Sequence, residues 1–146
     1  RNRKMSALGA CIGAIVGLVA ITPAAGFVTI SESIFIGFIA AITSNLAISW
    51  FSKTGIDDTL DVFPSHGVGG MVGMILTAVF AKDVGLVAGE TETFMWHIIA
   101  LVAVAMFTFG GSILFYKIVD VLIPVRVRQD QEERGLDASQ HGEEVN

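Results

Sequence analysis

The chain has 146 residues, of which 53% are hydrophobic and only 16% are charged, and its formal net charge is −5. The charges gather at the N-terminal edge, in loops and after Pro124, which leaves long uncharged stretches between them. This pattern excludes an ordinary soluble domain and makes a lipid bilayer the expected surrounding. The acidic balance and the absence of a basic groove exclude nucleic acid as a partner.

Four apolar stretches are of near-spanning length and predict an all-α integral membrane protein. The predicted transmembrane region covers residues 1–123, with spans at about 5–21, 34–51, 62–81 and 94–123. The fourth span would be ~45 Å long, so it has to tilt or project from a hydrocarbon core of ~30 Å. Residues 24–33 are expected to form a loop. Residues 124–146 are polar and predict a solvated tail with one short helix.

Small and uncharged polar residues predict how the spans pack. Glycines recur every fourth residue in the first span, and a similar stripe runs through the third span. Such stripes let helix backbones approach closely in lipid. The two stripes are Gly9, Gly13, Gly17 and Gly69, Gly73, Thr77. The second span carries Thr43, Ser44, Asn45 and Ser49. We expect these side chains to make hydrogen bonds between helices.

The distribution of Lys and Arg predicts the orientation of the chain. With four spans, both termini and the 53–61 loop share one side of the membrane. That side carries Arg1, Arg3, Lys4, Lys53, Lys117, Arg126, Arg128 and Arg134, whereas the other carries Lys82. The positive-inside rule therefore places both ends of the chain in the cytoplasm.

His66 is the main candidate functional residue. It stands between a loop with three carboxylates, Asp57, Asp58 and Asp61, and an apolar stretch rich in glycine. An ionisable group at membrane depth is costly to desolvate, so a role in a pore or cavity has to be considered. From the residues alone, a structural histidine at a helix start is the favoured interpretation and the pore role is the alternative. The carboxylates favour a hydrated mouth of the membrane region over a site for a hard cation.

The sequence predicts neither an enzyme nor a cofactor. It has no Walker loop, no GxSxG motif and no His-x-x-x-His pair, and no nucleophile is spaced with a general base. His97 follows Trp96 near the start of the fourth span, where we interpret it as a histidine at the membrane interface. No metal ligand set is expected.

One motif extends from the loop through His66 and resembles a known family. The pattern is Asp57-Asp58-x-x-Asp61-Val62-Phe63-x-x-His66-Gly67-Val68-Gly69-Gly70-x-Val72-Gly73. It resembles the tenth-helix signature of ammonium transporters, the Amt/Mep/Rh superfamily, on its Amt branch. Two further segments resemble the end of the eighth helix and the cytoplasmic tail of that family. They are Leu18-Val19-Ala20-Ile21-Thr22-Pro23-Ala24-Ala25-Gly26 and Gly135-Leu136-Asp137 followed by His141-Gly142-Glu143.

The resemblance implies an eleven-helix, homotrimeric transporter built from inverted repeats, with a pore in each subunit. This chain would be its C-terminal portion, helices eight to eleven plus the tail. His66 would be the second of two paired pore histidines, Val62 an apolar residue of the pore wall, and Asp61 an acid at the cytoplasmic mouth. The other pore histidine and the outer gate belong to earlier helices of the family, so we expect the chain alone not to conduct.

The resemblance also implies a regulatory tail and partners. Gly135, Asp137, Ser139 and His141 fall in the tail, where Ser139 matches a threonine that plant members phosphorylate. Bacterial-type members bind a PII signal protein on the cytoplasmic face. The expected substrate is ammonium or ammonia. Two alternatives stay open: an ammonium sensor that signals through the tail, and an unrelated four-span protein with a structural histidine.

Overall fold

The structure is a computed structural model that describes residues 7–143, and the described residues are helical with no β-strand. The helices are α1 (Ala7–Ile21), α2 (Ile30–Phe51), the π-helix η1 (Phe63–Val68), α3 (Gly69–Phe80), the 3-10 helix η2 (Leu86–Ala88), α4 (Glu92–Leu122), α5 (Gln129–Arg134) and the π-helix η3 (Asp137–His141). The helices form two compact units, one ending at Ala103 and the other beginning at Val104.

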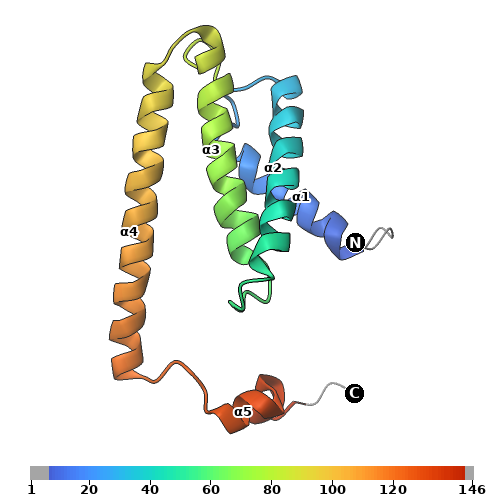
Figure 1. The fold of residues 1–146 in the computed structure, drawn as a ribbon, viewed down its shortest axis with the longest axis vertical. Helices are drawn as coiled ribbons and strands as arrows, with labels where there is room; N and C mark the ends of the chain where they lie inside the picture. Colours follow the sequence, from blue (N-terminus) through green and yellow to red (C-terminus); the bar gives the residue numbers. More distant parts are fainter. Residues whose placement is uncertain (1–6, 144–146) are drawn as a thin grey trace. The chain divides into compact units, whose positions relative to one another are not determined.

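The first unit is built on α1, α2 and α3, which contact one another, with α1 inclined to the other two (Figure 1). Each helix contributes a stripe of residues spaced by four, which places them on one helix face. The stripes are Val16 and Ala20 on α1, Ile36, Ala40 and Ser44 on α2, and Gly69, Gly73 and Thr77 on α3, all buried. Most of these residues are small, so the helices meet at close range.

The predicted small-residue stripes are confirmed where the helices meet. A Cβ added to Gly37 of α2 would lie 3.8 Å from the Cα of Gly17. A Cβ added to Gly69 would lie 3.4 Å from the Cγ1 of Val16. In the first stripe the contact is made by the Gly17 backbone, because nothing lies within 4 Å of a Cβ added to Gly13 or to Gly17 itself.

The start of α2 corrects the prediction of a loop over residues 24–33. The helix begins at Ile30 instead of residue 34, because Thr29 and Glu32 form a capping box. The Glu32 carboxylate accepts the Thr29 backbone N–H at 2.6 Å, and the Thr29 hydroxyl accepts the Glu32 N–H at 3.4 Å. This pair satisfies two backbone donors that a helix start leaves free. At the same end, the Lys82 N–H donates to the Phe27 carbonyl at 2.8 Å.

Within residues 7–143, three helical segments are long and apolar enough to cross a membrane: Ile30–Phe51, Phe63–Phe80 and Glu92–Leu122. They correspond to the predicted spans 34–51, 62–81 and 94–123. The predicted span 5–21 is represented by α1, whose 15 residues are ~22 Å long. Its first residues, Met5 and Ser6, lie outside the described residues, so its role as a fourth span stays a prediction. Outward faces carry large apolar side chains, such as Phe38 at 63% and Phe107 at 82% exposure.

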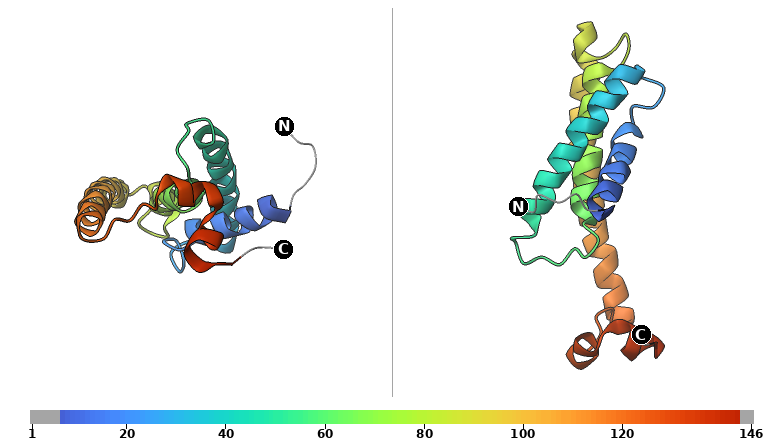
Figure 2. Two further views of the ribbon diagram at one scale, coloured as in Figure 1. Left: turned by 90° about the horizontal axis from the view of Figure 1, so that it is seen from below. Right: turned by 90° about the vertical axis from the view of Figure 1, so that its right-hand side faces the viewer.

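The second unit holds the C-terminal part of α4 and the tail. The described part of the tail contains two short helices instead of the single one predicted, α5 and η3, which contact each other (Figure 2). Gly135 ends α5 with a φ of +91°, a backbone conformation that favours glycine because it has no Cβ. This turn lets the chain reverse between α5 and η3.

Candidate functional site: the helix start around His66

His66 lies on η1, a π-helical turn that leads directly into α3. The residue is exposed on the first unit, and its ring has no hydrogen-bond partner among the described residues. π-Helical turns inside longer helices occur frequently at functional sites. Because η1 and α3 together form the span Phe63–Phe80, the histidine stands within a segment able to cross a membrane.

Val62 and Asp61 lie just before this turn. Val62 is 49% exposed, and it precedes His66 by four residues, so the two occupy neighbouring positions along one side of the helix. Asp61 is half-buried and adopts a φ of +51°, a left-handed conformation that Asp tolerates better than most residues. Its carbonyl accepts both the backbone N–H of Ser65, at 2.9 Å, and the Ser65 hydroxyl.

Asp58 caps the helix that carries His66. Its carboxylate accepts the Val62 N–H at 2.9 Å on Oδ1 and the Phe63 N–H at 2.8 Å on Oδ2. Negative charge at a helix N-terminus is favourable because the first N–H groups have no partner within the helix. Sequence reasoning assigned Asp58 to a hydrated mouth and missed this role. The signal was an Asp shortly before a helix whose first turn contains Pro64.

Ser44 joins α2 to the same turn. Its hydroxyl donates to the Pro64 carbonyl at 2.7 Å, and Ser44 is only 1% exposed. The predicted hydrogen bonding between helices is therefore confirmed for Ser44. The Thr43 hydroxyl instead donates to carbonyls of its own helix, Ile39 and Ala40, both at 3.0 Å. Asn45 and Ser49 lie along a groove on one face of α2.

Aromatic side chains pack beside the turn. The rings of Phe51 and Phe63 are 5.4 Å apart between centroids, and the Trp50 ring lies 6.3 Å from that of Phe51. A Cβ added to Gly67 would lie 3.0 Å from the Cδ2 of Phe63, so Phe63 also covers the helix one turn ahead. These contacts fix one side of η1 and leave His66 exposed.

His97 is separate from these residues in the chain and has a local partner. It is half-buried on α4, and its Nδ1 donates to the Thr93 carbonyl at 2.9 Å, within its own helix. Among the described residues, no group of three or more His, Cys, Asp or Glu side chains could hold a metal ion.

The tail residues predicted from the resemblance lie close together along the chain in the second unit. Ser139 is half-buried on η3, and its hydroxyl donates to the Gln131 carbonyl of α5 at 3.2 Å. Its backbone N–H donates to the Gly135 carbonyl at 3.1 Å, and the Glu143 N–H donates to the Asp137 carbonyl at 3.1 Å. His141 is exposed at the end of η3.

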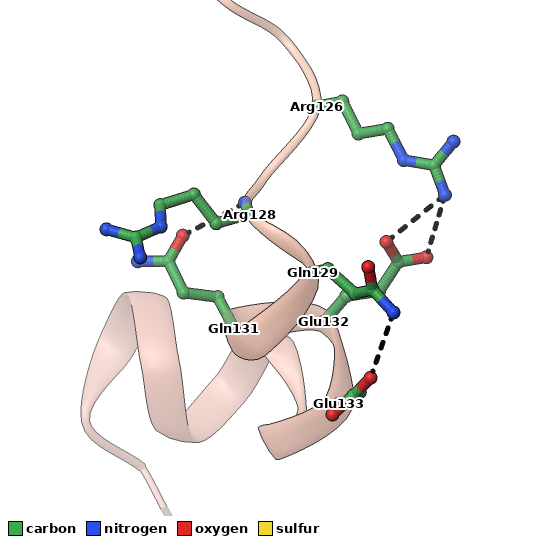
Figure 3. Close-up of polar contacts among 6 residues, drawn as sticks. All are labelled: Arg126, Arg128, Gln129, Gln131, Glu132 and Glu133. Carbon is green, nitrogen blue, oxygen red and sulfur yellow. Dashed lines mark hydrogen bonds and ion pairs between the residues drawn. The ribbon is translucent and has the colours of Figure 1, made fainter.

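Charged and polar side chains make contacts on and just before α5 (Figure 3). Arg126 pairs with Glu132 at 3.2 Å, and Gln129 donates to Glu133 at 3.2 Å. The Arg128 backbone N–H donates to the Gln131 side chain at 3.2 Å. The side chains of the Arg126–Glu132 pair are 80% and 51% exposed, and exposed ion pairs contribute little to stability. The hydrogen bond from Ser139 to the Gln131 carbonyl, which joins η3 to α5, is therefore more important for the structure of the tail than this ion pair.

Comparison with known proteins identifies the family. The model of the Ammonium Transporter Family matches residues 1–146. The chain is 42% identical to an ammonium transporter of Bacillus subtilis, over 99% of the chain and 38% of that protein. It is 37% identical to the ammonium transporter Amt1 of Archaeoglobus fulgidus, over 96% of the chain and 37% of that protein.

A solved structure shows the same fold. The crystal structure of Saccharomyces cerevisiae Mep2 superposes with a TM-score of 0.84 at 33% identity, over 95% of this chain and 34% of Mep2. The chain thus spans about a third of the length of these relatives. Its assignment to helices eight to eleven and the C-terminal tail stays a prediction, because the matched lengths alone do not mark which third it represents.

These matches exclude the alternative of an unrelated four-span protein. Together with the apolar helices they indicate a multi-pass membrane protein. The chain belongs to the ammonium transporter family.

Proposed function

We propose that this chain forms part of the path by which an ammonium transporter moves ammonium or ammonia across a cell membrane. The observation that carries the proposal is the exposure of His66 on a π-helical turn inside a membrane-spanning segment. An ionisable side chain at such a depth is stable only against other protein or a water-containing path. The family to which the chain belongs supplies the substrate class.

The chemistry of imidazole suits a small hydrogen-bonding solute. A neutral imidazole ring donates a hydrogen bond from one nitrogen and accepts one on the other. Ammonia, which can both donate and accept, can pair with either nitrogen. In the proposed mechanism, ammonium gives its proton to water before it enters a narrow apolar lumen, ammonia crosses by hydrogen bonding to His66 and a second histidine, and it takes up a proton from water on the other side. Val62 lines the lumen and Asp61 lies at its cytoplasmic mouth. Bare cations are rejected because the lumen does not replace their hydration.

We also propose the assembly and the control of the transporter. Three copies would form a homotrimer with one pore each, as the resemblance implies. The tail residues Gly135, Asp137, Ser139 and His141 would lie in the cytoplasm and regulate transport, with a PII-type signal protein as a partner on that face. The excess of Lys and Arg on the side of the termini supports this orientation. The relatives are named as transporters, which favours transport over catalysis.

The test compares two histidines in the complete transporter that contains this chain. Uptake of radiolabelled methylammonium is measured in cells without other ammonium transporters. We expect His66→Ala to lower uptake about tenfold, since loss of a hydrogen bond worth about 1.4 kcal/mol corresponds to that factor. His97→Ala is the matched control, because His97 bonds within its own helix. Equal uptake by both variants, at equal amounts in the membrane, would exclude the proposed role of His66.

A further inference from the structure

Among the residues that the structure describes, one side-chain hydrogen bond joins the turn that carries His66 to a neighbouring helix. Ser44 of α2 donates its hydroxyl to the Pro64 carbonyl at 2.7 Å, and both residues are buried. Pro64 lies two residues before His66, within the same π-helical turn. The bond therefore fixes η1 relative to α2 close to the histidine.

The geometry of a π-helix makes this fixation important. A π-turn contains one more residue per hydrogen-bonded ring than an α-turn, and it persists only where its surroundings hold it. If the turn relaxed to α-helical pairing, the register would slip by one residue. One residue corresponds to a rotation of ~100° about the helix axis. Such a slip would turn the imidazole away from its direction in the structure.

Besides the apolar packing of the Phe51 ring of α2 on Phe63, the other hydrogen bonds made by side chains at the turn lie on its N-terminal side. The Asp58 carboxylate caps Val62 and Phe63, and the Ser65 hydroxyl bonds to the Asp61 carbonyl. These contacts come from the turn and from the loop that precedes it, so they hold the start of the helix and not its rotation against α2. Ser44 supplies the polar contact from another membrane-spanning helix.

We infer that Ser44 is a positioning residue for His66: its hydroxyl, bonded to the Pro64 carbonyl, holds the π-helical turn in the register that directs the imidazole into the transport path. The inference rests on the proposed function of His66, and it goes further by naming the residue that sets the direction of the ring. Ser44 itself does not touch the substrate.

The experiment uses four substitutions in the complete transporter, with methylammonium uptake normalised to the amount in the membrane. Ser44→Ala removes the hydroxyl, and we expect maximal uptake to fall about tenfold. Ser44→Thr keeps the hydroxyl donor, and we expect it to restore at least about half of wild-type uptake. Thr43→Ala is the matched control on the same helix. Its hydroxyl bonds only to carbonyls of α2, so we expect uptake near that of the wild type.

Ser44→Cys covers the case in which Ser44→Ala fails to reach the membrane. A thiol has nearly the volume of the hydroxyl but is a weak donor, so we expect uptake below that of Ser44→Thr. The inference is overturned if Ser44→Ala takes up methylammonium like the wild type. If Ser44→Ala does not reach the membrane, wild-type uptake by Ser44→Cys overturns it. An equal loss in Ser44→Ala, Ser44→Thr and Thr43→Ala also overturns it, because it indicates general packing.

The outcome for His66 separates this inference from the proposed function. If His66→Ala abolishes uptake while Ser44→Ala does not change it, the positioning role fails and the pore role stands. If His66→Ala transports like the wild type, the proposed function fails whatever Ser44 does, and the positioning role fails with it.

Discussion

Gly73 of α3 lies directly against the backbone of Ala20 in α1: a Cβ added to Gly73 would come 2.6 Å from the Ala20 Cα. Real Cβ atoms are essentially never found so close to another atom, and a backbone cannot yield as a flexible side chain can. The crossing of these two helices therefore depends on the absence of a side chain at position 73.

Gly73→Ala is expected to destabilise the first unit. The added methyl group forces α1 and α3 apart, and overpacking of this kind costs about 1–3 kcal/mol. Thermal unfolding of the complete transporter in detergent, followed by size-exclusion chromatography, measures the effect. Gly70→Ala is the control, because its Cβ would lie at an ordinary 3.7 Å from the Cγ1 of Val19. A Gly73→Ala protein that melts no lower than Gly70→Ala would contradict the close crossing.

Thr29→Ala is expected to weaken the start of α2. The substitution removes the side-chain half of the capping box with Glu32, and loss of such a cap costs about 1 kcal/mol. The same melting assay serves here, with Ser33→Ala as the comparison. The Ser33 hydroxyl only bonds to the Ile30 carbonyl within the helix, at 2.7 Å. If both variants melt together, the cap does not define the helix start.

Asp58→Asn is expected to destabilise the helix that carries His66. An amide has one acceptor oxygen where the carboxylate uses two, and it loses the favourable charge at the helix N-terminus, so we expect a cost of about 0.5–2 kcal/mol. Asp57→Asn is the control, because the Asp57 carboxylate accepts the Thr59 hydroxyl and caps no helix. This substitution should change the free energy of unfolding by less than about 0.5 kcal/mol. The reverse order of melting temperatures would show that the wrong carboxylate has been assigned to the cap.

Ser139→Asp is expected to separate η3 from α5 and to lower uptake severalfold. An ionised carboxylate cannot donate to the Gln131 carbonyl, and it would stand in a segment that already carries Asp137 and Glu143. Ser139→Thr retains a hydroxyl donor and is the control in the methylammonium assay. Equal uptake by the two variants would remove Ser139 from the regulation of the transporter.

The isolated 146-residue chain is expected not to conduct. It spans about a third of the length of its relatives. The resemblance implies that the second histidine of the proposed pore belongs to helices outside this chain. Reconstitution in liposomes, with an internal pH dye to report ammonia entry, tests this expectation. The complete transporter in parallel vesicles is the positive control, and ammonium-dependent pH change with the chain alone would overturn it.

Much of the helical arrangement could be predicted from the sequence, because hydrophobic length and glycine spacing depend on local pattern. The stripe of Gly69, Gly73 and Thr77 is buried as expected, and three predicted spans recur as helices. The early start of α2 was missed because residues 24–33 look polar. The start of the helix is set by the Thr29–Glu32 capping box. This pair of residues is a weaker sequence indication of a helix boundary than hydropathy is.

The candidate site was less predictable than the fold. His66 stood out because an ionisable residue next to a long apolar stretch is visible in the sequence itself. The residues that hold it did not stand out, because their roles depend on backbone geometry that pattern does not reveal. The π-helical turn, the left-handed Asp61 and the bond from Ser44 to Pro64 all depend on tertiary contacts across at least one turn or helix.

The two ends of the three-helix bundle are secured by different kinds of atoms. At the end where α1 leads into α2, main chain joins main chain between Lys82 and Phe27, a link that survives almost any side-chain exchange. At the opposite end, Asp58 and Ser44 secure the turn through their side chains. Substitutions at Asp58 or Ser44 can therefore alter the histidine end of the bundle, whereas the Lys82–Phe27 bond at the other end does not depend on the identity of a side chain.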